Sequence, residues 1–187
     1  MTRPTDYAPV RSSISAEPAL RLRLATDVIA QAAARKVQIT TAESCTGGLI
    51  MAALTDVPGS SLVIDRGFVT YSNVAKARML EVPTHTLRDH GAVSEQTVEA
   101  MATGAARLAN AAIAIAVSGI AGPGGGSDAK PVGTVCFGFV FSGKDNDTVT
   151  RTQTMLFDGA DRSVIRAQSV NHALQVVQEH LIVTGTG

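Results

Sequence analysis

The chain has 187 residues, enough for one compact domain with a hydrophobic core and short for two. Hydrophobic residues make up 45% and charged residues 17%, a composition that excludes a disordered chain and a membrane-spanning one. The 16 basic and 16 acidic residues balance without a run of Lys and Arg, so nucleic acid is not an expected partner. Two cysteines without metal or disulfide spacing, and no apolar signal core near the start, predict a cytoplasmic protein with neither metal nor membrane contact.

The first elements follow a weakly patterned beginning. Residues 1–17 contain proline breaks and little apolar periodicity, so we expect a mobile N-terminal tail. A single domain is expected over residues 18–187. It opens with a predicted helix over 18–35, because apolar side chains recur at helical spacing and Pro18 suits the first turn. A short β-rich run then covers residues 37–42.

The rest of the chain alternates between helical and extended patterns. Helices are predicted over 49–57, 74–82, 94–110 and 161–182. Strands are predicted over 62–72, 113–120, 132–142 and 147–157, and residues 83–90 are interpreted as a hinge. The strand at 113–120 is apolar throughout, which is typical of a strand buried on both faces. This order predicts an α/β fold, a three-layer α/β/α sandwich with a mixed β-sheet.

The segment TAESCTGG (41–48) runs from a predicted strand through a glycine-rich turn into a helix. Backbone N–H groups at such a turn suit an anion or an oxyanion, and Ser44 and Cys45 stand where a nucleophile would be presented. The alternative interpretation is an ordinary helix cap. A Cys/His pair is disfavoured, because the histidines fall in expected loops or on helix surfaces: His85, His90, His172 and His180.

The segment YSNVAK (71–76) joins a predicted strand to a predicted helix. A cap at Ser72 or Asn73 places Lys76 in the first helical turn. The positive end of the helix, together with partial burial, would lower the pKa of Lys76 and leave it able to act as a base. The alternative is an exposed surface lysine, which describes most lysines.

The segment SGIAGPGGG (118–126) has five glycines in nine residues directly after the buried strand. Glycines permit close approach of the backbone to a ligand, and ligands of open α/β sheets lie beyond the carboxyl ends of strands. The alternative is a flexible connector. Cys136 falls in an alternating strand pattern and is expected in the core.

Taken together, the segments from about Ala42 to Val140 resemble the CinA C-terminal domain family, whose stand-alone members are nicotinamide-nucleotide amidases. The shared signatures, in chain order, are TAESCTGG, LTDVPGSS, FVTYSN–AK, HGAVSEQTVEAMA and SGIAGPGGGS–KPVGTV. Five concordant segments are far more specific than any one of them.

The resemblance implies hydrolysis of nicotinamide mononucleotide to nicotinic acid mononucleotide and ammonia by a Ser/Lys mechanism. Ser44 would attack the carboxamide carbon, and a neutral Lys76 would take its proton and later give it to ammonia. Tyr71 would assist, by hydrogen-bonding the dyad or by relaying the proton. No metal or cofactor is implied, because the base is a side chain and the oxyanion acceptors are backbone N–H groups.

Further residues are expected to hold the substrate. The turn at Gly47 and Gly48 is the candidate for the oxyanion-binding amides, with Thr46 nearby. Ser118 and the glycine-rich loop that follows it would hold the ribose phosphate. The loop positions singled out are Gly119 and Gly122.

Two positions depart from the usual family pattern. The family usually has Thr at the position of Ser118, so the hydroxyl is retained. The segment from Phe157 to Arg162 is one residue longer than the family's compact version. Arg162 is expected to supply the cation for the phosphate, with Arg166 one turn on as its substitute.

Other functions stay open on the sequence alone. One is a catalytically silent nucleotide-binding module in competence or the DNA-damage response, which would keep the glycine-rich loops without needing Lys76. Another is an amidase for a different pyridine nucleotide or small amide. The resemblance also suggests a homo-oligomer.

Overall fold

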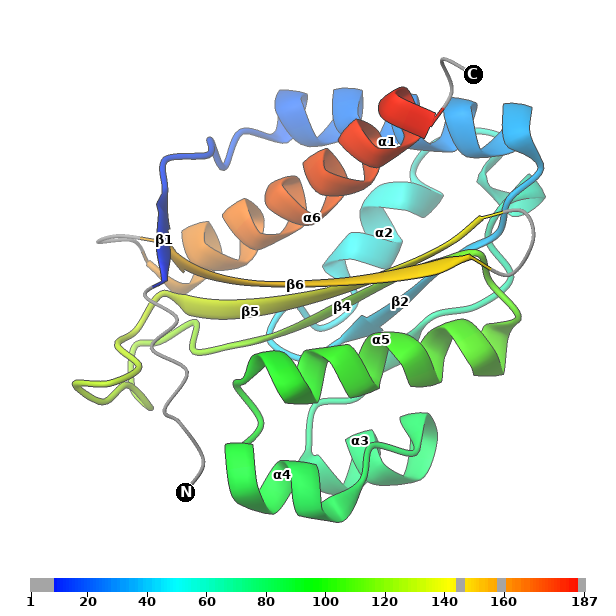
Figure 1. Ribbon diagram of the computed structural model, residues 1–187. Helices are drawn as coiled ribbons and strands as arrows, with labels where there is room; N and C mark the ends of the chain where they lie inside the picture. Colours follow the sequence, from blue (N-terminus) through cyan, green and yellow to red (C-terminus); the bar gives the residue numbers. More distant parts are fainter. Residues whose placement is uncertain (1–8, 144–146, 158–160, 185–187) are drawn as a thin grey trace.

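The computed structural model describes residues 9–143, 147–157 and 161–184. A six-stranded mixed sheet lies between two layers of helices, as Figure 1 shows, and this confirms the predicted three-layer α/β/α architecture. The strands are β1 (Val10–Ser12), β2 (Ile39–Glu43), β3 (Phe68–Val69), β4 (Ile113–Gly119), β5 (Thr134–Ser142) and β6 (Thr148–Phe157). The helices are α1 (Pro18–Arg35), α2 (Leu49–Thr55), α3 (Asn73–Leu80), α4 (Thr84–His90), α5 (Glu95–Ala109) and α6 (Arg162–Thr184).

The order of strands across the sheet is β1-β6-β5-β4-β2-β3. Strands β2, β3 and β4 run parallel to one another, and β5 runs antiparallel to both β4 and β6. The carboxyl ends of β2, β3, β4 and β6 therefore meet at one edge of the sheet, which is where ligands bind in open α/β sheets.

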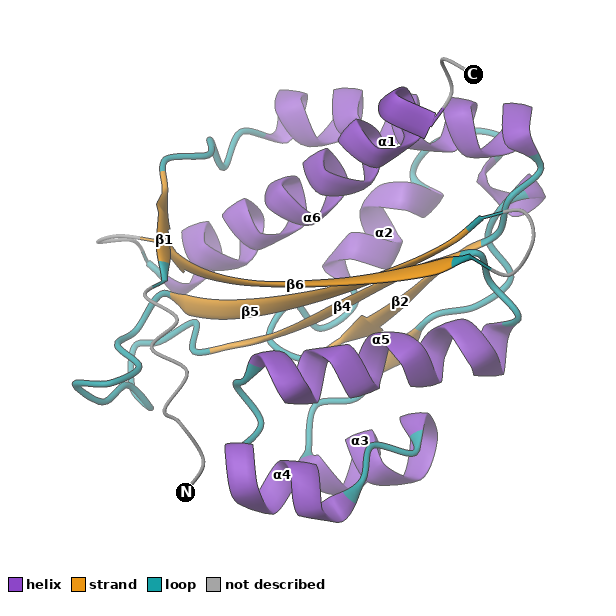
Figure 2. Cartoon of the chain, viewed as in Figure 1, coloured by secondary structure: helices purple, strands orange, loops and turns teal. Residues whose placement is uncertain are grey.

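Helices cover both faces of the sheet, as Figure 2 shows. Each face also has its own hydrophobic cluster. Helices α1, α2 and α6 cover one face, where the phenylalanines of β5 and β6 contribute to the larger cluster. Helix α5 lies directly on the other face, with α3 and α4 outside it. No described helix is long and apolar enough to cross a membrane.

The expectation of a mobile tail over residues 1–17 is wrong for its second half. Val10–Ser12 forms β1 and pairs in parallel with β6. The buried side chain of Asn171 then donates hydrogen bonds to the carbonyls of Ser15 and Glu17. Periodicity failed here because a three-residue strand is too short to show a pattern. Residues 1–8 lie outside the described part of the chain.

The region after α2 also differs from its prediction. Of the strand expected over 62–72, Phe68–Val69 pairs with β2 and Ile64 forms one isolated parallel bridge to Ile39, while Ser60–Leu62 forms a 3-10 turn. The hinge expected over 83–90 is instead α4, which begins after Pro83 and packs against α5. Both errors fall at the periphery, where packing against a neighbouring element decides between local conformations.

Candidate active site

Ser44 and Lys76 meet at the carboxyl edge of the sheet. Ser44 directly follows β2, and Lys76 lies in the first turn of α3, which follows β3. The Lys76 Nζ is 2.9 Å from the Ser44 Oγ. Both residues are buried, with 8% of Ser44 and 1% of Lys76 exposed. A hydroxyl held against a buried amine is the arrangement in which the amine can act as the base of a serine nucleophile.

The environment of Lys76 favours its neutral form. Burial removes water from the ammonium group and lowers the pKa of Lys76 below its usual value of 10.5. Its second hydrogen bond goes to the backbone carbonyl of Thr70, also at 2.9 Å. This carbonyl fixes the amine beside Ser44, and a neutral amine keeps one lone pair for the serine proton.

The start of α3 explains how Lys76 is placed. The Ser72 Oγ caps the helix by accepting a hydrogen bond from the N–H of Ala75. Lys76 is therefore in the first turn, as the sequence predicts, where the positive end of the helix further disfavours an ammonium charge. The alternative of an exposed surface lysine is wrong.

A residue that the sequence analysis missed holds the turn after Ser44. Glu43 is fully buried, and its carboxylate accepts hydrogen bonds from the N–H groups of Gly48, Ile50 and Met51. It thus caps α2 and occupies the anion-binding position at the start of that helix. An acidic residue five positions before a glycine-led helix was the available signal.

The expected oxyanion amides are consequently already engaged. The N–H of Gly48 donates to Glu43, and the N–H of Gly47 donates to the carbonyl of Ser44. Both glycines have positive φ, 61° and 99°, so their role in this structure is to turn the chain between β2 and α2. The expected role of these two amides in binding the oxyanion therefore stays a prediction, and in this structure both N–H groups already have protein acceptors.

The structure also favours Ser44 over its neighbour Cys45 as the nucleophile. Burial raises the pKa of the Cys45 thiol to about 12, so it stays protonated near neutral pH and is a poor nucleophile.

His172 is not a helix-surface residue, because its ring packs on Phe137 with centroids 4.8 Å apart. Burial lowers the pKa of His172 to about 4. Its ring nitrogen is bonded to Gln153.

Two arginines from the start of α6 reach the site in different ways. Arg166 donates from Nε to the carbonyl of Cys45 at 3.1 Å and from Nη2 to the carbonyl of Thr46 at 2.9 Å. Arg162 is exposed and donates to the carbonyl of Gly122 and to the hydroxyl of Tyr71, both at 2.9 Å. The longer Phe157–Arg162 segment runs through residues 158–160, which lie outside the described residues.

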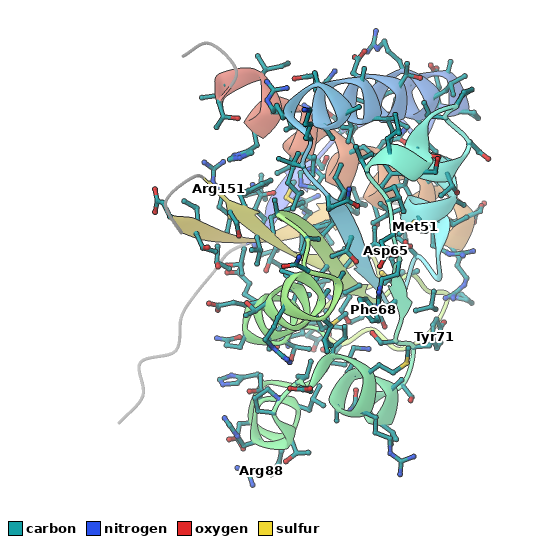
Figure 3. The ribbon with its side chains drawn as sticks, turned by 90° about the vertical axis from the view of Figure 1, so that its right-hand side faces the viewer. Met51, Asp65, Phe68, Tyr71, Arg88 and Arg151 are labelled. Carbon is teal, nitrogen blue, oxygen red and sulfur yellow. The ribbon has the colours of Figure 1, made fainter. Side chains whose placement is uncertain are left out.

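Tyr71 is therefore not bonded to the dyad, contrary to one of its expected roles. The residue is 61% exposed, and Figure 3 shows it at the surface on the same side of the molecule as Phe68. The chain alternates direction here, so the Thr70 carbonyl faces Lys76 while the Tyr71 side chain points outward to Arg162. Arg162 joins Tyr71 to the glycine-rich loop across the rim of the site.

Ser118 and Gly119 end β4, the strand next to β2. Ser118 is buried, and the N–H of Ser44 donates to the carbonyl of Val117 just before it. A Cβ at Gly119 would come within 2.7 Å of the Val135 side chain, so this glycine is required for packing against β5. Gly122 has a φ of 77° and presents its carbonyl to Arg162.

The fold and site together define an α/β protein that presents a serine to a buried lysine at the carboxyl edge of its sheet. The model of the CinA C-terminal domain family matches residues 21–181. The chain belongs to this family.

Individual relatives cover most of the chain. It is 54% identical over 144 residues to the nicotinamide-nucleotide amidohydrolase PncC of Enterobacter agglomerans, covering 77% of this chain and 85% of the relative. The protein of the same name from Escherichia coli K12 is 49% identical over 149 residues, covering 80% and 87%. The crystal structure of the competence/damage inducible protein CihA from Agrobacterium tumefaciens superimposes with a TM-score of 0.81 at 43% identity, covering 91% of this chain and 99% of that one.

Proposed function

We propose that this protein is a nicotinamide-nucleotide amidohydrolase, which converts nicotinamide mononucleotide and water to nicotinic acid mononucleotide and ammonia. The observation that carries the proposal is the buried contact of 2.9 Å between the Lys76 Nζ and the Ser44 Oγ. It occurs in a chain about half identical to relatives named for this activity.

The reaction has two halves, each using the same two side chains. In the first, the Ser44 Oγ attacks the carboxamide carbon while the neutral Lys76 takes the hydroxyl proton. The tetrahedral intermediate collapses, its C–N bond breaks, and Lys76 returns the proton to the departing ammonia. In the second, Lys76 takes a proton from water, which attacks the Ser44 ester. The bond between the acyl carbon and the Ser44 Oγ then breaks, Lys76 returns the proton to Oγ, and the carboxylic acid leaves.

The rim residues are proposed to hold the nucleotide part. Arg162 lies one helical turn before Arg166 on α6 and is exposed. Its guanidinium group would bind the phosphate. Tyr71, bonded to Arg162, and the loop at Gly122 would flank the ribose phosphate. Ser118, at the end of the neighbouring strand, would help this loop to hold the ribose phosphate.

We further propose that the enzyme works in the cytoplasm as a homo-oligomer, without metal, nucleic acid or membrane. Both cysteines are free thiols, as a reducing compartment favours. Apolar side chains stand exposed around β3 and α3, where a second copy of the chain would cover them: Val69, Val74 and Met79.

The test is ammonia release from nicotinamide mononucleotide by the wild type, Ser44→Ala and Lys76→Met. We expect turnover by the wild type and a loss of at least about 10³-fold in kcat for each variant, because nucleophile and base act as a unit. Circular dichroism and thermal unfolding establish that the variants are folded. Turnover that survives Ser44→Ala contradicts the mechanism. Binding of the nucleotide by the wild type without ammonia release favours the silent binding module instead.

A further inference from the structure

The backbone N–H groups of residues 44–48, the Ser44 turn, differ in whether they already have a hydrogen-bond acceptor. The N–H of Ser44 donates to the carbonyl of Val117, and the N–H groups of Gly47 and Gly48 donate to Ser44 and Glu43. These three amides are committed to holding the turn. The oxyanion of an acyl transfer needs a donor that is free before the reaction and already in place.

Two amides of the turn remain. The Cys45 N–H lies against its own thiol. Within the described part of the chain, the N–H of Thr46 donates to no protein acceptor. Thr46 is also fully buried, and its hydroxyl has no hydrogen-bond partner among the same residues. A buried donor without an acceptor is costly, which points to a ligand as its missing partner.

Arg166 determines where this free N–H points. A trans peptide is planar, so the carbonyl of Cys45 and the N–H of Thr46 point in opposite directions. Arg166 holds that carbonyl from α6, on the α1 and α2 side of the sheet. The Thr46 N–H therefore points away from Arg166 and α6. Figure 1 shows α3, the helix that carries Lys76, on the other side of the sheet from α6.

We propose that the N–H of Thr46 binds the oxyanion formed at Ser44, and that Arg166 is the positioning residue that aims it. The inference rests on the proposed function only in that Ser44 performs an acyl transfer. Arg166 spends Nε and Nη2 on the two carbonyls, so its contribution is the orientation of a peptide and not the binding of a phosphate.

The first experiment measures the second-order rate at which an alkyl fluorophosphonate labels Ser44. Labelling forms an Oγ–P bond, expels fluoride, sends the hydroxyl proton to Lys76 and places a phosphonyl oxygen where the oxyanion would be. We expect Arg166→Met to lower the rate by about 10²- to 10³-fold, the usual effect of losing one oxyanion donor. Arg166→Lys keeps the charge and can hold one carbonyl, so its labelling rate should lie between those of the wild type and Arg166→Met.

Arg35→Met is the matched control. Arg35 also donates to two main-chain carbonyls, those of Gln31 and Leu181, at the end of the molecule where α1 finishes and β2 begins. This variant loses a comparable anchor and should leave the labelling rate unchanged. Circular dichroism and thermal unfolding are recorded for all variants, and Arg166→Lys provides a folded variant if Arg166→Met does not fold.

The kinetics of turnover distinguish a positioning role of Arg166 from a role in binding the substrate phosphate. With nicotinamide mononucleotide, the Arg166 variants should have a lower kcat and a nearly unchanged KM. With nicotinamide riboside, which lacks the phosphate, kcat should fall by the same factor. A loss confined to the phosphorylated substrate, or a folded Arg166→Met labelled as fast as the wild type, overturns the inference, as does a wild type that is not labelled. Arg166-dependent labelling without turnover of either substrate overturns only the proposed substrate.

Discussion

The amine of Lys76 loses its hydrating water when the chain folds, and this loss of water favours the neutral form that can act as a base. The residue is 1% exposed and its amine is bonded to one hydroxyl and one carbonyl. Neither partner carries a negative charge that would stabilise an ammonium ion, so burial is the largest influence and lowers the pKa of Lys76. A lysine left in water would be protonated at neutral pH and could not accept the serine proton.

The pH dependence of activity should follow this shift. We expect kcat/KM to fall as pH decreases through the pKa of Lys76, because the protonated amine cannot take the proton of Ser44. The midpoint should lie below 10.5, the usual value for lysine. Initial rates of ammonia release between pH 5 and about 10 measure the profile, within the range in which the fold persists. A midpoint at or above the usual value would contradict a base desolvated by burial.

The neighbouring Glu43 shows how far one residue can be interpreted from its sequence context. Ser44 and Lys76 were identifiable as a pair because both stand in segments that resemble signatures of the CinA C-terminal domain family. An acidic residue before a glycine-led helix was a weak signal for Glu43 and did not assign its bonds, since its carboxylate reaches residues five, seven and eight positions ahead. A turn has to be built before its hydrogen bonds can be assigned.

At the scale of elements, the position of Lys76 depends on how closely α3 approaches α5. Gly104 lies in the buried face of α5, against the end of α3. A Cβ at this position would overlap the backbone carbonyl of Leu80. Because the obstacle is main chain, α3 as a whole would have to move, and Lys76 would move with it.

Gly104→Ala should therefore weaken both the fold and the activity. We expect the free energy of unfolding to fall by about 1–3 kcal/mol, because overpacking outweighs the ~1 kcal/mol that Ala gains over Gly in a helix. The kcat should fall as the Lys76 Nζ leaves its 2.9 Å contact with Ser44. Urea unfolding and ammonia release measure the two effects.

Thr103→Ala is the matched control, since Thr103 is exposed on the same helix. It should change neither quantity. A Gly104→Ala variant as stable as the wild type would show that α3 and α5 can separate without cost.

At the scale of the whole molecule, the segment before α1 closes the sheet. Strand β1 pairs with the outer side of β6, so the first and last strands of the described chain are neighbours (Figure 1). Asn171 of α6 secures the connection by donating to Ser15 and Glu17, and its own carbonyl accepts from Arg21. A fully buried amide with three partners is a fixed anchor.

Asn171→Leu should release this segment. The carbonyls of Ser15 and Glu17 would lose the hydrogen bonds from Asn171, and we expect the free energy of unfolding to fall by about 1–3 kcal/mol. The exposed edge of β6 should also increase self-association. Chemical denaturation and size-exclusion chromatography measure these effects. Gln175→Leu serves as the control, because the Gln175 side chain bonds only to Glu179 on the same helix among the described residues. Equal effects in both variants would contradict the anchor.

Local pattern determined the long elements. The apolar run of β4 and the amphipathic α5 with its Ser94 cap follow from spacing and residue type, whereas Ser44 and Lys76 were singled out by the resemblance to a family. These features are local, since their periodicity or capping is complete within a few residues.

Only the tertiary structure decided which groups meet. The parallel order of β2, β3 and β4 brings Ser44, Lys76 and Ser118 to one edge, and α6 returns from the far end of the chain to place Arg166 on the Ser44 turn. It also assigns Glu43 to the amides of α2 and turns Tyr71 outward to Arg162. The physical reason is that each backbone N–H takes one acceptor at a time, and competition among acceptors is settled by the packing of distant segments.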